Sequence, residues 1–175
     1  MIDEMKPDMS CHPYRRKGVY IVIIIPYVAI LISVFMYLWS FNVVYSLILL
    51  SFYLGMCYFQ EYCCAYQECP YIGEFCPALA GIYPANILAK IRYGGKKIVK
   101  SKKTFEINAA VATVCWIGIM GFPLYWIAKM GILLAVGYVV LHAVYYAFHG
   151  LMLCPVCAIR DTCPGGKLQG LVITR

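Results

Sequence analysis

The sequence predicts an all-α integral membrane protein, a four-transmembrane-helix bundle made of two hairpin repeats. Three observations support this class. Of the 175 residues, 63% are hydrophobic and only 13% are charged, whereas a soluble domain is nearer half apolar and a quarter charged. Two apolar blocks of roughly 40 residues each allow two spans apiece, because one span needs about 20 residues. Each block is followed by a cysteine-rich loop.

The four spans are expected at about residues 19–39, 43–59, 107–127 and 131–150. The first block is broken at 39–42 and the second at 128–131, which predicts a tight turn within each. No Lys, Arg, Asp or Glu lies inside any of the four spans. We expect one membrane domain over 1–175 and no cleavable signal peptide, because the first apolar run is too long for one.

Basic residues fall almost entirely on one side of this topology. The segment before the first span, the middle loop and the tail contain 14 of the 15 Lys and Arg residues, and only Lys129 lies on the other side. The positive-inside rule therefore predicts that both termini and the middle loop are cytoplasmic. The net charge of +7 then reflects topology and attraction to the lipid bilayer. No nucleic-acid partner is expected, because no aromatic-interleaved basic module is present.

A basic interfacial segment is expected between the hairpins, over 84–104. Pro84 suits the first turn of a short helix, and Ile87, Leu88 and Ile91 would form its apolar face at the membrane surface. Gly94 and the glycine after it end this helix. The basic linker that follows is expected near lipid headgroups, although a solvated loop explains it equally well.

Cysteine is the most informative residue type. Eight of the ten cysteines lie at or near the expected cytoplasmic face, mostly in loops 60–80 and 151–165. That compartment is reducing, so metal or redox chemistry is favoured over a disulfide framework. Four are followed by proline, which ends a helix and stiffens the chain, as in bacterial iron–sulfur motifs. These four are Cys69, Cys76, Cys154 and Cys163.

The two cysteine clusters align with each other. Residues 64–70 and 157–164 both read Cys-Ala, then polar residues that include an acid, then Cys-Pro. This match indicates an internal duplication, with parallel repeats related by an axis along the membrane normal; chance similarity of two short segments is the alternative. Three thiols in the tail leave a tetrahedral set incomplete. We therefore expect at least one first-cluster thiol within metal-sharing reach of the tail.

The expected ligands combine both clusters. Two tail cysteines have the two-residue spacing common to zinc and iron–sulfur sites, and Cys163 supplies a third thiol. Either the histidine one turn before the pair or a cysteine of the first cluster would supply the fourth ligand. Cysteine is also a small hydrophobe, which is the expected role of Cys115 and the slightly favoured role of Cys11 and Cys57. Palmitoylation is a further alternative for the adjacent pair 63–64. The expected ligands are Cys64, Cys69, Cys76, Cys154, Cys157 and Cys163, with Cys63 and His149 as additional candidates.

The sequence allows two kinds of metal cofactor. A thiolate set with scarcely any histidine allows either iron–sulfur or zinc. The membrane setting and the repeated Cys-Pro favour iron–sulfur, one or two [4Fe-4S] clusters. In the last span, His142 is a candidate proton relay, haem ligand or quinone contact, because an ionisable residue within a membrane is a functional candidate. A neutral histidine bonded to a neighbouring helix is the alternative.

Three functions remain open at this point. The first is a membrane redox subunit of a larger complex, which passes electrons between a soluble partner and a membrane carrier such as a quinone. The second is a membrane thiol–disulfide oxidoreductase, since four helices and a CxxC resemble the vitamin K epoxide reductase type in outline. Its thiols work on the oxidising side, opposite to the side expected here. The third is a zinc-clipped accessory or assembly subunit. Hydrolases are excluded, because no serine triad or facing carboxylate pair is present.

Overall fold

The fold is known from a computed structural model, which describes residues 8–77, 82–94, 98 and 100–163. Regular structure within these residues is entirely helical. Four helices are long and apolar enough to cross a bilayer, which confirms the predicted all-α class with four candidate spans. They are α1 (Lys17–Phe41), α2 (Val43–Tyr66), α5 (Lys102–Met130) and the helical stretch Ile132–Val156, which begins with α6 (Ile132–Phe148).

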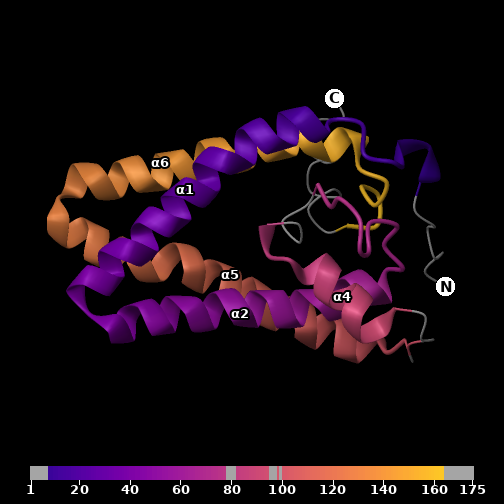
Figure 1. The fold of residues 1–175 in the computed structure, drawn as a ribbon, viewed down its shortest axis with the longest axis horizontal. Helices are drawn as coiled ribbons and strands as arrows, with labels where there is room; N and C mark the ends of the chain where they lie inside the picture. The colour runs from indigo at the N-terminus through magenta and orange to yellow at the C-terminus, as the bar shows by residue number, and fades with distance from the viewer. Residues whose placement is uncertain (1–7, 78–81, 95–97, 99, 164–175) are drawn as a thin grey trace.

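The helices form two hairpins with their tight turns at the same end of the molecule (Figure 1). Asn42 ends α1 and caps α2, because its side chain accepts a hydrogen bond of 2.9 Å from the Val44 N–H. Gly131 joins α5 to α6. The first and last described residues, the middle loop and α4 (Ala85–Tyr93) lie together at the opposite end, which we call the thiol end.

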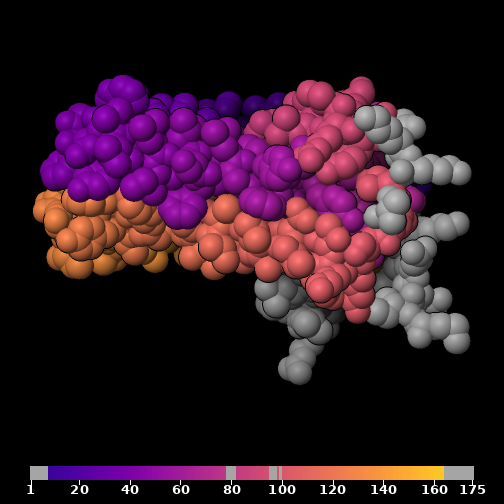
Figure 2. All heavy atoms as spheres, turned by 90° about the horizontal axis from the view of Figure 1, so that it is seen from below, coloured from indigo at the N-terminus to yellow at the C-terminus, as the bar shows by residue number. Residues whose placement is uncertain are grey.

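Helices α2 and α5 make the most extensive helix–helix contact, and the two hairpins lie against each other along the bundle (Figure 2). Small residues permit this approach. A Cβ added to Gly118 of α5 would lie 2.7 Å from the Phe52 ring of α2, and one added to Gly55 of α2 would lie 2.8 Å from the Cys115 sulfur. The helix surfaces that face outward are also apolar, as at Leu133, which indicates a lipid surrounding.

The second helix is longer than predicted. It continues seven residues beyond Phe59, to Tyr66, so Cys63 and Cys64 belong to its last turns rather than to a loop. The extension includes Glu61, which is buried and paired with Arg92 of α4. Apolar length alone therefore underestimates this helix, because a cationic partner lets it continue past the hydrophobic run.

The middle segment contains the short helix expected there. Pro84 precedes α4 and Gly94 follows it, and the outward side chains of Ile87 and Ile91 are exposed. The basic linker is shorter than predicted, because α5 begins at Lys102, where the Ser101 side chain caps it. Lys102 and Lys103 are therefore helical.

The chain enters the bundle interior just before α4. Tyr53 donates a hydrogen bond of 3.1 Å to the Ile82 carbonyl, and Tyr83 is completely buried. Tyr53 lies 13 residues before the end of α2, which corresponds to about 20 Å along the helix. Figure 1 shows this part of the chain between the helices. Irregular backbone at this depth is tolerated where protein surrounds it.

Candidate metal centre

The first cysteine cluster begins where α2 ends. Glu68 adopts a left-handed conformation with φ of 49°. Its N–H bonds to the Ala65 carbonyl at 3.1 Å, and the Cys69 N–H bonds to the Cys64 carbonyl at 3.2 Å. This pair of bonds is the Schellman pattern of helix ends. It folds the chain back, so that Cys69 lies beside the helix turn that carries Cys64.

Helix α4 holds the loop that carries Cys69 and Cys76. Asn86 is buried, and its amide donates to the Tyr71 and Glu74 carbonyls at 3.2 and 2.7 Å. The Asn86 carbonyl accepts from the Gly73 N–H at 3.2 Å. Gly73 has φ of 74°, a conformation that favours glycine. These hydrogen bonds therefore fix the backbone of the loop against α4.

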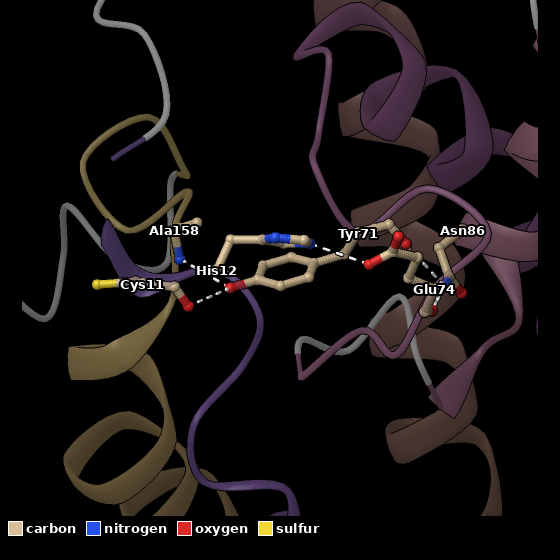
Figure 3. Close-up of polar contacts among 6 residues, drawn as sticks. All are labelled: Cys11, His12, Tyr71, Glu74, Asn86 and Ala158. Atoms are coloured by element: carbon tan, nitrogen blue, oxygen red, sulfur yellow. Dashed lines mark hydrogen bonds and ion pairs between the residues drawn. The ribbon is translucent and has the colours of Figure 1, made fainter. Parts of the chain in front are cut away.

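The Tyr71 hydroxyl joins three segments of the chain, as Figure 3 shows. It accepts a hydrogen bond of 3.1 Å from the Ala158 N–H in the tail. It donates one of 3.3 Å to the Cys11 carbonyl in the N-terminal segment. The His12 ring pairs with the Glu74 carboxylate at 2.9 Å beside it. We call this arrangement the Tyr71 clip, and it fixes the two cysteine clusters against each other.

The second cluster follows α6 through two irregular turns, η2 (His149–Leu153) and η3 (Cys154–Val156). The first is π-helical, a form common at functional sites. The Cys157 N–H bonds to the Cys154 carbonyl at 3.1 Å, and the Cys163 N–H bonds to the Ile159 carbonyl at 2.8 Å. Two tight turns thus hold the tail thiols in a small volume.

His149 connects the two clusters. Its Nε2 lies 3.1 Å from the Pro77 carbonyl, and because a carbonyl only accepts, Nε2 carries the proton. The other nitrogen, Nδ1, therefore keeps its lone pair, and the Cys154 sulfur lies 3.7 Å from it. Pro77 directly follows Cys76, so His149 contacts both loops. Its free nitrogen faces a thiol, as a metal ligand or a base would.

Five thiols from both clusters line one pocket of about 250 Å³ at the thiol end. Three further residues, Met56, Phe105 and Trp116, contribute apolar walls. Cys157 packs in the same buried core as Cys64, Cys69 and Cys76. Cys154 is half-buried and contacts His149 rather than the pocket. The pocket thiols are Cys63, Cys64, Cys69, Cys76 and Cys163.

None of the ten cysteines is in a disulfide bond. Across the described ranges, no three His, Cys, Asp or Glu side chains are already arranged around a single point that would hold one metal ion. The five pocket thiols instead lie along the walls of the pocket. Cys57 lies in the core between the helices and Cys115 packs on Gly55, the packing role that was expected for Cys115.

Burial controls the charge of the thiols outside the helices. It raises the pKa of Cys69 to about 11 and the pKa of Cys157 to about 12. Both thiols are therefore protonated at neutral pH and are weak nucleophiles. A metal that binds them must displace the protons, so its affinity would rise with pH.

Several residues that shape this site have no recognisable signal in the sequence. Tyr71 is one of 16 tyrosines, and nothing in its local pattern distinguishes it. Asn86 lies on a helix that was predicted only as an amphipathic surface element. Trp116 lies in an apolar span, where aromatic residues are common.

No family model, curated protein or solved structure matches the chain.

Proposed function

We propose that this chain is a membrane redox subunit that holds an iron–sulfur centre in the thiol pocket. The observation that carries the proposal is the convergence of five thiols from both cysteine clusters on one pocket. Thiolates are the donors that iron–sulfur clusters use. The apolar residues of the pocket would shield part of the centre from water, although Gln60, Gln67 and Thr113 also line it. Solvent exposure is one of the factors that set the reduction potential of such a centre.

The size of the pocket favours a cluster over a single ion. Zinc–sulfur bonds are about 2.3 Å, so four ligands of one zinc ion must converge on one point. A [4Fe-4S] cluster spreads its thiolates around a larger body, which suits five thiols that line one pocket without converging on one point. Cys64, Cys69, Cys76 and Cys163 are the proposed ligands of one cluster, with Cys63 as a substitute. A second metal would use Cys154, Cys157 and His149.

The proposal includes the orientation and partners of the subunit. The distribution of basic residues supports a cytoplasmic thiol end, where a soluble redox partner would have access to it. The two cysteine clusters follow corresponding hairpins, in keeping with a duplicated unit. Electrons would pass from the partner through the centre to a carrier dissolved in the bilayer, of the quinone class.

Metal analysis of anaerobically purified protein tests the proposal. The wild type should contain iron and acid-labile sulfide, and show the broad visible absorption of an iron–sulfur cluster. Cys69→Ser and Cys163→Ser should each lose most of this iron. Cys115→Ala, which changes a cysteine outside the pocket, should retain it. Wild-type iron in both serine variants, or zinc as the only metal in the wild type, would refute the proposed centre; the second result would favour a zinc-clipped accessory subunit.

A second candidate function rests on the contact of Cys154 with His149. A histidine lone pair facing a thiol at 3.7 Å is the arrangement that activates a thiol for exchange. Together with Cys157, this pair would serve a membrane thiol–disulfide oxidoreductase. Alkylation of intact cells followed by mass spectrometry separates the two functions. A disulfide between Cys154 and Cys157 in the native protein would support the second and count against a metal at these residues.

A further inference from the structure

The interior of the bundle contains a group of polar atoms that lack partners. Within the described part of the chain, four such side-chain atoms are buried without a hydrogen bond: the Tyr83, Tyr138 and Tyr145 hydroxyls and the His142 Nε2. The exposed fraction of each residue is 7% or less. Buried polar groups are nearly always satisfied by protein or by a bound molecule. We call these four residues the inner polar site.

The hydrogen bonding of His142 determines what it can bind. Its Nδ1 lies 2.9 Å from the Tyr138 carbonyl, and because a carbonyl only accepts, Nδ1 carries the proton. Nε2 therefore presents a lone pair and needs a donor. The three hydroxyls both donate and accept. A matching ligand must thus offer at least one donor and one acceptor.

Aromatic rings shape the space around these atoms. The rings of Tyr27 and Tyr145 stack with centroids 3.9 Å apart and an angle of 17° between their planes. The His142 ring meets the Tyr27 edge at 5.5 Å and lies 4.2 Å from the Tyr138 ring. Tyr83 is supplied by the chain segment that enters the bundle. Aromatic side chains therefore surround the unpartnered atoms.

The inner polar site is connected to the thiol pocket. Trp116 lines that pocket, and its indole N–H donates to the Tyr146 hydroxyl at 2.8 Å. The Tyr146 hydroxyl lies 3.0 Å from the Tyr27 hydroxyl, and the Tyr27 ring contacts His142. A continuous chain of contacts therefore leads from the thiols into the part of the bundle that lipid surrounds.

We infer that the inner polar site binds the head group of a quinone-class carrier. Such a molecule is flat and enters from lipid. Its reduced form donates an O–H to His142 Nε2, and its oxidised form accepts from a tyrosine hydroxyl. The inference deepens the proposed function, on which its role in electron transfer rests, because it names the residues that hold the membrane carrier. Binding itself depends only on the inner polar site.

Binding of decylubiquinone to the purified full-length protein tests the inference. Quenching of tryptophan fluorescence reports the affinity, for both the quinone and the quinol. Tyr138→Phe should weaken quinone binding and His142→Phe quinol binding, each about fivefold, the effect of one lost hydrogen bond. The control Tyr37→Phe removes a hydroxyl that contacts the Trp126 carbonyl at 3.4 Å, near the tight turns, and should bind as the wild type does.

Two further measurements separate the possible failures. Without ligand, Tyr138→Phe should unfold at the same temperature as the wild type or higher, because it removes an unsatisfied buried hydroxyl. Cys163→Ser should lose iron and still bind decylubiquinone, so a failed metal proposal leaves this inference testable. Absence of saturable binding, or unchanged affinity in Tyr138→Phe with a folded protein, means that the inner polar site holds water only, and overturns the inference.

Discussion

At the scale of single residues, the Tyr71 hydroxyl connects segments that lie far apart in the chain. It is buried, and it hydrogen-bonds to both the N-terminal segment and the tail. Neither bond lies within a helix, so no regular structure compensates for their loss. The position of the second cysteine cluster relative to the first therefore depends strongly on one oxygen atom.

We predict that Tyr71→Phe destabilises the protein by about 1–3 kcal/mol, because it leaves the buried Ala158 N–H without an acceptor. Thermal unfolding in detergent measures the change. The matched control is Tyr66→Phe, since the Tyr66 ring stacks on Phe105 at 4.6 Å and its hydroxyl bonds to no described residue. Equal stability of the two variants would show that the Tyr71 clip contributes nothing.

The buried thiols predict a dependence of stability on pH. The pKa of Cys69 is raised from 9.0 to about 11 and that of Cys157 from 9.0 to about 12, so folding favours the protonated thiols. The resulting stability is complete below pH 9 and should fall as pH rises toward 11 and 12. Denaturant unfolding of metal-free protein across this range measures it, and Cys69→Ala should reduce the slope. A flat profile would contradict the burial of these thiols.

At the scale of helices, α4 is attached to α2 by the ion pair between Arg92 and Glu61. The Glu61 side chain is 4% exposed, whereas that of Arg92 is 47% exposed. The Arg92 guanidinium also lies over the Tyr58 ring, 4.8 Å from its centroid. Loss of the ion pair would therefore cost more at the Glu61 carboxylate than at Arg92, because water cannot reach the carboxylate to replace its partner.

A double-mutant cycle tests this dependence. Arg92→Met should destabilise the protein by about 2 kcal/mol, because it leaves a buried carboxylate without its cation. Adding Glu61→Met should recover most of the loss, since apolar replacements of buried pairs are often neutral. Denaturant unfolding provides the free energies. Additive effects of the two changes would show that Glu61 and Arg92 do not interact.

Hydropathy was sufficient to predict the helices but not their ends. Apolar runs and the interruptions at 39–42 and 128–131 located four helices. The extension of α2 through Glu61 depends on Arg92, 31 residues away, and a local pattern contains no such information. The π-helical turn after α6 and the entry of Tyr83 into the bundle likewise depend on tertiary contacts.

At the scale of the whole molecule, the sequence predicted that both cysteine clusters would lie on the same side, from charge alone. The pocket that Cys163 shares with the first cluster agrees with this arrangement. The contacts that bring the clusters together involve Tyr71, Asn86 and His149. Only His149 was a candidate, because histidine beside cysteine is a recognisable ligand, whereas buried tyrosine and asparagine have no comparable signature.

The orientation of the molecule gives a prediction at this scale. A reporter fused after Arg175 should behave as cytoplasmic, because 14 of 15 basic residues lie on that side. Activity of cytoplasmic and exported reporters at this position measures the orientation, and a fusion between α1 and α2, at Asn42, is the control with the opposite expectation. An exported C-terminus would place the thiols in an oxidising compartment and favour disulfide exchange.

The Tyr71 clip also has a consequence for how the protein is made. The Asp8 N–H bonds to the Ala158 carbonyl at 2.9 Å, and Cys163 supplies one wall of the pocket. The ribosome must therefore have made the chain through Cys163 before these partners can meet. A centre bound there would be loaded only after both hairpins are inserted, so possession of the metal would mark a chain in which both hairpins are in place.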